Sequence, residues 1–234
     1  MILIWLISIF LGGGLLAWIS GRLNPLLPRL IALAATLITF TGTVVLWLGN
    51  PMPSLETGWL VSYTREWIPA FGIQFKLAAD GLSLLMLVLT TFLGVIAVLA
   101  SWKGIQKRTG FYHFNLLFIL AGITGVFVAL DLFLFYFFWE LMLIPMYFLI
   151  SIWGHEKRNY ASVKFFLFTQ ASGLLMFISI IVLFFINGSN TGNYTFDYEQ
   201  LLNTTLSPET GFWVMLGFFV AFAVKLSSVP LHSW

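Results

Sequence analysis

The sequence contains no cysteine and few charged residues, and both absences exclude classes of protein. Without cysteine there is no disulfide framework, no thiolate metal site and no ligand set for an iron–sulfur cluster. Charged residues make up 9% of the 234 residues, whereas an ordinary soluble domain has about 25%. Zinc-ligand spacing, a phosphate-binding glycine loop and a nucleophile–histidine arrangement are also missing. We therefore predict that the chain itself binds no metal ion and no redox cofactor.

Long apolar blocks dominate what is present, since 60% of the residues are hydrophobic. A helix rises about 1.5 Å per residue, so about 20 apolar residues cross a hydrocarbon core of about 30 Å. The predicted fold is therefore all-α, a polytopic transmembrane bundle of about seven helices in a lipid bilayer. The blocks run near Ile2 to Ile19, Leu30 to Leu48, Leu82 to Trp102, Phe111 to Leu130, Leu132 to Trp153, Ala161 to Ile186, and Phe212 to the end.

Basic residues gather in three of the connections between these blocks, and this bias predicts the orientation. They are Arg22 and Arg29, then Lys103, Lys107 and Arg108, then Lys157 and Arg158. The segment 49–80 dilutes its two basic residues with acids, and 187–211 has none. Cytoplasmic loops carry the excess of Lys and Arg, so we predict an N-terminus outside the cytoplasm. The net charge of +2 reflects this topology and does not indicate nucleic-acid binding.

Two charged residues lie deep inside apolar blocks. Glu140 interrupts FFWELMLIPMYF about nine residues, or roughly 13 Å, after Asp131. Lys225 lies about thirteen residues, or roughly 20 Å, after Phe212. A charge at the centre of a membrane helix costs about 2.5–3.5 kcal/mol on insertion scales and usually faces a bundle interior or a water-filled path. The pair is the predicted proton-transfer site.

Each of these charges precedes a proline by five residues, Pro145 after Glu140 and Pro230 after Lys225. Proline has no N–H and displaces the carbonyl four residues back, so both prolines are predicted helix breaks. Broken helices beside buried charges are typical of ion pathways in membranes. Ser227 and Ser228 are candidates for meeting the freed carbonyl groups.

Simpler interpretations stay open for each polar residue. The simpler roles are a bond from Glu140 to a neighbouring helix and an extension of Lys225 to an interface. Lys164, Thr169, Gln170 and His232 either line a proton path or serve as interfacial and helix-joining groups. Asp80 and Asp131 either cap helices or open a path. His113 and His155 lie near segment ends, where an interfacial role is expected.

Three stretches carry a resemblance to a known family: DLFLFYFFWELMLIPMYFLISIWG, KFFLFTQASGLLM and AFAVKLSSVPLHSW. With the DGLSLL opening of the third helix, they resemble the antiporter-like proton-pumping membrane subunits of respiratory complex I, of the bacterial chain M type. The resemblance assigns Glu140 and Lys225 to the charged pair of one half-channel. It departs at Ser227, where the family usually has proline.

The resemblance also implies the organisation of the chain. Residues 1–110 would hold helices one to three with an outside loop at 49–80, and 111–234 would hold helices four to seven of an incomplete first antiporter-like repeat. The chain stops at LHSW without a polar tail, so we expect it to be the N-terminal part of a longer protein of about fourteen helices.

The resemblance implies a non-redox, proton-translocating subunit of NADH:quinone oxidoreductase, in the bacterial inner membrane. NADH, flavin, iron–sulfur clusters and quinone would then bind partner subunits. Other membrane subunits, including neighbouring antiporter-like ones, are the expected partners. Two alternatives are a subunit of a multi-subunit cation/proton antiporter and a membrane scaffold whose buried ion pair only fixes helix register.

Overall fold

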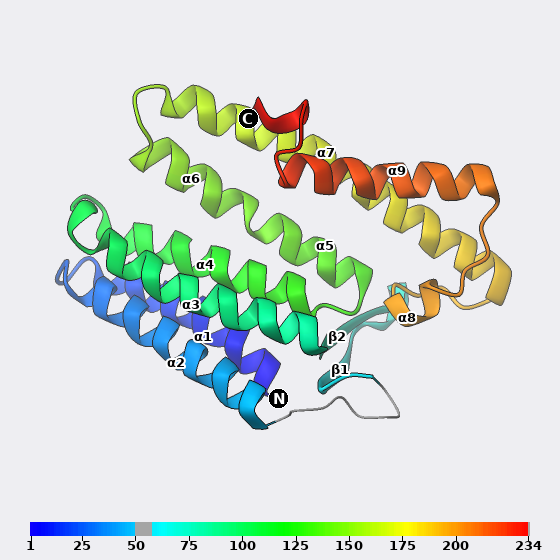
Figure 1. Ribbon diagram of the computed structural model, residues 1–234, viewed down its shortest axis with the longest axis horizontal. Helices are drawn as coiled ribbons and strands as arrows, with labels where there is room; N and C mark the ends of the chain where they lie inside the picture. The colour runs from blue at the N-terminus through cyan, green and yellow to red at the C-terminus, as the bar shows by residue number, and fades with distance from the viewer. Residues whose placement is uncertain (50–57, 234) are drawn as a thin grey trace. The chain divides into compact units, whose positions relative to one another are not determined.

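A computed structural model describes residues 1–49 and 58–233 (Figure 1). Within these residues, seven helical segments are long and apolar enough to cross a membrane, which confirms the predicted helical membrane fold. The elements are α1 (Ile2–Ser20), α2 (Leu27–Gly49), β1 (Val61–Ile68), a 3-10 turn (Pro69–Phe71), β2 (Ile73–Ala79), α3 (Gly81–Gly104), α4 (Thr109–Val128), α5 (Leu132–Leu141), α6 (Leu143–Trp153), α7 (Arg158–Thr191), α8 (Tyr198–Leu201), α9 (Pro208–Lys225) and a 3-10 turn (Leu231–Ser233).

The chain divides into two compact units. Unit 1 comprises residues 1–63 and 77–128, and unit 2 comprises 64–76 and 129–234. In unit 1, α1 packs against α2 and α4, and α3 packs against α2 and α4. Buried threonines donate to carbonyls of their own helices, and Thr43 of α2 also hydrogen-bonds Thr91 of α3 at 3.0 Å. Polar side chains therefore join helices inside this unit, although the buried hydroxyl of Thr124 in α4 has no hydrogen-bond partner among the described residues.

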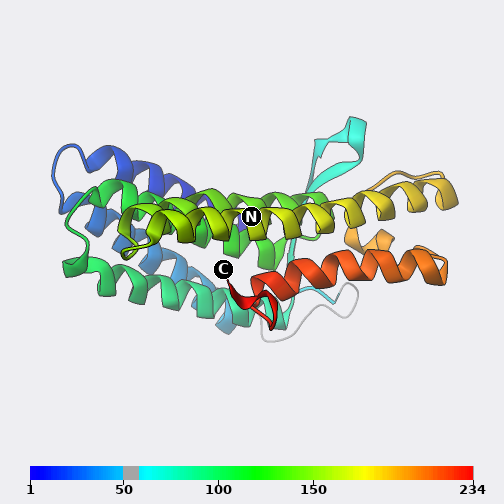
Figure 2. The ribbon, with the colours of Figure 1, turned by 90° about the horizontal axis from the view of Figure 1, so that it is seen from above.

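In unit 2, α7 is the central element. It is 34 residues long and packs against α5, α6 and α9 (Figures 1 and 2). Its buried face includes the small polar residues Ser162, Thr169, Ser172 and Ser179. Each of these hydroxyls donates to a carbonyl three or four residues back in α7, which leaves its lone pairs facing the helices packed on that side.

A β-hairpin replaces the irregular loop that the sequence analysis expected over most of 49–80. Strands β1 and β2 pair with each other, and residues 50–57 lie outside the described part. The tip of the hairpin belongs to unit 2, where Leu130 donates its N–H to the Lys76 carbonyl at 2.9 Å. Trp67 of β1 packs edge-on against Phe137 of α5. The strand pattern VSYTREWI alternates too little to predict a strand from sequence.

The fifth predicted span is broken in the middle. α5 ends at Leu141 and α6 begins at Leu143, with Met142 between them. Pro145 lies buried in the first turn of α6 and has no N–H to donate to the Leu141 carbonyl. Glu140 thereby becomes the second-last residue of α5.

Candidate proton-transfer site

Glu140 faces a polar set of side chains within unit 2. The groups that act on its carboxylate are the Tyr136 hydroxyl, the Lys225 ammonium and the Gln170 amide. Gly173 of α7 lies directly against the carboxylate, and a Cβ at this position would collide with its oxygen. The glycine therefore creates the space that lets a glutamate reach the polar face of α7.

Lys225 is held against an aromatic face rather than in a contact ion pair. Its Nζ lies 4.9 Å from the centroid of the Trp139 ring, a distance within the range of a cation–π interaction. Trp139 is 9% exposed and meets Phe222 of α9 edge-on. The charges of Lys225 and Glu140 interact, but among the described residues no Glu140–Lys225 nitrogen–oxygen distance falls within 4.0 Å. Lys225 thus has two competing partners, one carboxylate and one indole.

The helix that carries Lys225 ends there, so the expectation of an apolar helix from Phe212 to the end is wrong. Ser228 donates its N–H to the Ala223 carbonyl at 2.9 Å, and Ser227 donates to the Val224 carbonyl at 3.1 Å. With Ser227 at φ 58°, this is a Schellman cap. Pro230 follows and has no N–H for the Leu226 carbonyl. Lys225 is consequently at a helix terminus instead of mid-helix.

The remaining candidates differ in their distance from the pair. Gln170 acts on Glu140, while Thr169 and Ser172 are buried and hydrogen-bonded within α7. Lys164 lies six residues before Gln170, and its Nζ is 6.0 Å from the centroid of the Tyr160 ring and 5.8 Å from that of the Phe168 ring. Ser227 and His232 are exposed and Ser228 is half-buried. The structure therefore brings Gln170 to the pair and leaves His232 at the surface.

Asp131 caps α5 and also ties it to the hairpin. Its carboxylate accepts N–H groups of Phe133, Leu134 and Gln74, each at 3.0 Å, and the side chain is fully buried. Burial raises the pKa of Asp131 although three N–H donors oppose it. At the start of α3, Asp80 accepts the Ser83 N–H at 2.7 Å, which lowers the pKa of Asp80. Both aspartates act as helix caps.

Next to Asp131, Lys76 forms ion pairs with Asp197, at 2.6 Å, and with Glu199. Burial lowers the pKa of Lys76, but the hydrogen bonds and charges of the two acids together raise it above its ordinary value of 10.5. This cluster joins β2 to the connection between α7 and α9. Sequence analysis missed this cluster, because Lys76 is more than 120 residues away from both acids in the sequence.

His113 is the clearest error among the minor candidates. The sequence suggested an interfacial residue, yet His113 is fully buried in α4 because this helix is surrounded by α1, α2 and α3. Its Nδ1 lies 2.8 Å from the Thr109 carbonyl, and its Nε2 has no hydrogen-bond partner among the described residues.

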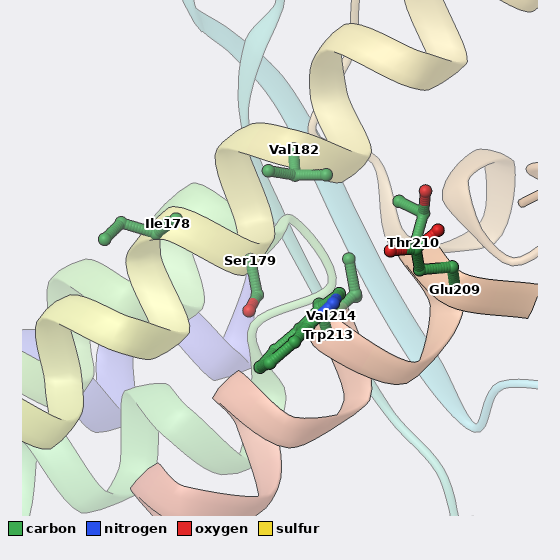
Figure 3. Close-up of a pocket in the computed structure, with 7 residues that line it drawn as sticks. All are labelled: Ile178, Ser179, Val182, Glu209, Thr210, Trp213 and Val214. Carbon is green, nitrogen blue, oxygen red and sulfur yellow. The ribbon is translucent and has the colours of Figure 1, made fainter. Parts of the chain in front are cut away.

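A cavity of about 280 Å³ lies between α7 and α9, at the end of α9 that is far from Lys225 (Figure 3). Ser179 of α7 points toward Trp213 of α9, and Glu209 and Thr210 lie at its edge. Glu209 precedes Lys225 by sixteen residues, or roughly 24 Å of helix. The cavity is therefore separate from the charged pair.

Within residues 1–49 and 58–233, no three His, Asp or Glu side chains are grouped to hold a metal ion.

The part of the chain that contains Glu140 and Lys225 matches a known protein family. The family described as NADH:quinone oxidoreductase/Mrp antiporter, transmembrane, matches residues 129–234, which include both charges. NADH-quinone oxidoreductase subunit M of Pseudomonas aeruginosa is 52% identical over the whole chain. Residues 129–234 of this chain belong to the NADH:quinone oxidoreductase/Mrp antiporter family. Among other members, NADH-quinone oxidoreductase subunit M of Escherichia coli is 51% identical, again over the whole chain.

Solved structures agree with membership of the NADH:quinone oxidoreductase/Mrp antiporter family. A chain of respiratory complex I from Thermus thermophilus with bound NADH matches with a TM-score of 0.84 and 29% identity, over 100% of this chain and 46% of that one. A chain of the Mrp complex from Dietzia sp. matches with a TM-score of 0.77 at 19% identity, over 25% of its length, and shows the shared fold. The chain spans 48% of the Pseudomonas and Escherichia relatives.

Proposed function

We propose that the chain is a membrane subunit of a proton-translocating NADH:quinone oxidoreductase and forms part of a proton half-channel. The observation that carries this proposal is the interaction of Glu140 with Lys225 inside unit 2, next to two helix ends. In this role the chain has no redox chemistry. NADH, flavin, iron–sulfur clusters and quinone belong to partner subunits, and neighbouring antiporter-like subunits adjoin it in a bacterial inner membrane.

The mechanism uses the two partners of Lys225. When the ammonium turns from the Trp139 face toward Glu140, the charge next to it changes and so does its proton affinity. The Glu140 carboxyl and the Gln170 amide then provide successive polar groups for a proton that moves on through hydrated space. Exchange of partners is possible because no short ion pair joins the described Glu140 and Lys225.

Helix ends contribute the remaining polar groups. The Leu141 carbonyl next to Glu140 receives no N–H from Pro145, and the Leu226 carbonyl next to Lys225 receives none from Pro230. Discontinuous helices in membrane transporters use such groups to line ion sites. Thr169 lies close to Gly173 on the face of α7 that meets Glu140, whereas Lys164 lies on another side of the helix, next to the exposed rings of Tyr160 and Phe168. Both are proposed as further relay or lining groups.

Single substitutions in the intact complex test the proposal. Glu140→Gln and Lys225→Ala should lower proton translocation coupled to NADH oxidation, because removal of a positioned proton-transfer group typically costs about 10²–10⁴-fold. Glu209→Gln and Lys103→Ala are the matched controls, since both side chains are exposed. Glu209 lies at the opposite end of α9 from Lys225, and Lys103 lies on α3 in unit 1. Proton yields at the control level in either test variant would reject the half-channel.

The second candidate is a cation/proton antiporter subunit, which the description of the matching family favours. This function predicts purification without NADH-oxidising subunits and proton movement driven by a sodium gradient. Isolation of the chain in a complex that oxidises NADH excludes this candidate.

A further inference from the structure

A cavity of about 500 Å³ lies in unit 1, where the α1–α2 and α3–α4 connections meet at the same end of the unit (Figures 1 and 2). It is separate from the proton-transfer site, whose residues all belong to unit 2. Two arginines line it from different connections, Arg22 after α1 and Arg108 before α4, and both are exposed. No acidic side chain contributes to its lining. The cavity therefore suits an anionic group.

Contact between two glycines brings the arginines together. A Cβ on Gly21 would lie 2.8 Å from the Gly110 Cα, and a Cβ on Gly110 would lie 2.9 Å from the Ala17 carbonyl oxygen. Neither position accepts a side chain, so the C-terminus of α1 and the N-terminus of α4 touch through backbone. The connections on either side of this contact consequently project their arginines around one space.

Two further features hold the cavity in shape. Arg29 of α2 donates to the Ile105 carbonyl at 2.8 Å and to the Gln106 side chain at 3.3 Å, so the α3–α4 connection is tied to α2. Arg108 has φ 53°, in the left-handed region that non-glycine residues rarely adopt. Strained backbone of this kind is often kept at ligand-binding positions. At this position a glycine or an asparagine would relieve the backbone strain, yet the residue is an arginine that lines the cavity.

The walls of the cavity are aromatic and lead into an apolar surface. Trp18 and Phe111 line it and lie 6.0 Å apart between ring centroids. On the same part of α1, the large apolar side chains Leu15, Leu16 and Ile19 are 45–61% exposed. Tryptophan and other aromatic rings at the end of a membrane helix lie at the level of lipid headgroups. An acyl chain can thus continue along α1 below a headgroup in the cavity.

We propose that this cavity binds the phosphate group of an anionic phospholipid, with Arg22 and Arg108 contacting the phosphate and Trp18 and Phe111 flanking the glycerol region. Arginine forms paired hydrogen bonds with phosphate oxygens. Basic pockets between membrane helices on the cytoplasmic side bind lipid headgroups in the same way. The apolar surface of α1 favours a lipid over free phosphate.

Photolabelling of the intact, delipidated complex tests the assignment. The probe is phosphatidylglycerol with a photoreactive group near the glycerol, in excess phosphatidylcholine, and mass spectrometry counts the label on peptides covering 14–25 and 106–115. Unlabelled phosphatidylglycerol should displace the label, whereas phosphatidylcholine and inorganic phosphate at the same concentration should not. Absence of label on these peptides, or displacement by inorganic phosphate, overturns the lipid assignment.

The variant Arg22→Gln/Arg108→Gln should reduce the affinity for the probe about 30-fold, because each basic side chain near an anionic headgroup contributes about 1 kcal/mol. Lys103→Gln/Lys107→Gln removes the same charge from the same end of unit 1 without altering the cavity lining, and should retain the wild-type affinity within about threefold. Equal losses in both double variants would mean a general charge effect and would refute a specific site.

Discussion

At the scale of single residues, Trp139 decides how the charged pair is arranged. It neighbours Glu140 in the sequence, and its ring receives the Lys225 ammonium 4.9 Å from the centroid. A cation over an indole gains about 0.5–2 kcal/mol, depending on desolvation. The indole therefore offers Lys225 an alternative of similar strength to a partly screened carboxylate, and the exchange of partners in the proposed mechanism depends on it.

Replacement of Trp139 tests this role. Trp139→Phe keeps an aromatic face, whereas Trp139→Met leaves a smaller, flexible apolar side chain without one. The Met variant should lower the rate of proton translocation up to about 30-fold, equivalent to 2 kcal/mol, and the Phe variant should lower it clearly less. Proton uptake by proteoliposomes during NADH oxidation measures both rates.

Trp213→Met is the control, since Trp213 lies on α9 but is 61% exposed and lines the other cavity. Equal rates for the Phe and Met variants at position 139 would contradict the cation–π role.

The sequence singled out the two charged residues but not the indole. Glu140 and Lys225 are conspicuous because charge is rare in apolar blocks. Trp139 is one of 10 tryptophans in a chain that also has 25 phenylalanines. Nothing in the sequence distinguishes an aromatic ring that contacts an ammonium group from one that faces lipid. Gly173 is hidden for the same reason, since its importance is a close approach that only the packed helices reveal.

At the scale of elements, the apolar blocks predicted where helices exist but not where they break. All seven predicted segments begin within about four residues of the start of an observed helix, since length and hydropathy determine a span. The break at Met142 and the end of α9 at Lys225 depend on local backbone bonding around Pro145 and Pro230. The hairpin was missed because its strand pattern is weak and the contacts of its tip, which lie within unit 2, join residues far apart in the sequence.

The Lys76 cluster stabilises the attachment of the hairpin to the α7–α9 connection. Lys76→Met should weaken this attachment by about 1 kcal/mol, allowing for the partial exposure of the lysine. A lysine with a raised folded-state pKa contributes its full stability below the unfolded value of 10.5 and loses it as pH rises through the folded value. The difference between wild type and variant should therefore be present at pH 8 and vanish well above pH 10.5.

The rate of cleavage by a protease that is active at alkaline pH measures this difference between wild type and variant. The informative fragments are those that end within residues 64–79 or 192–207. Arg65→Met is the matched control, because Arg65 lies exposed on β1 of the same hairpin. A difference between wild type and Lys76→Met that persisted unchanged at the higher pH would show that the lysine charge is not its cause.

At the scale of the whole molecule, the contacts are consistent with the predicted topology. The hairpin, Asp131 and Asp197 meet in unit 2, and the predicted crossings assign all three to the outside. The orientation of the N-terminus stays a prediction from the basic residues. Domain boundaries at 110 and 111 also stay a prediction, since they derive from the family resemblance rather than from compactness.

Single introduced cysteines test the orientation directly, because the chain has none of its own. In intact cells, a membrane-impermeant maleimide should label Asn203→Cys, in the exposed connection before α9, and should label Asn24→Cys only after permeabilisation. Mass spectrometry of this chain reports the labelled fraction. The opposite pattern would invert the predicted topology.

The exchange of the whole pair for apolar residues tests the central claim most directly. Glu140→Leu/Lys225→Leu removes both charges at once, and a buried ion pair with only a structural role tolerates such replacement. The measurement is the number of protons translocated per NADH oxidised by the assembled complex in proteoliposomes. Our account predicts a lower yield in a complex that still assembles. An unchanged wild-type yield would contradict it and would leave the pair as a structural element.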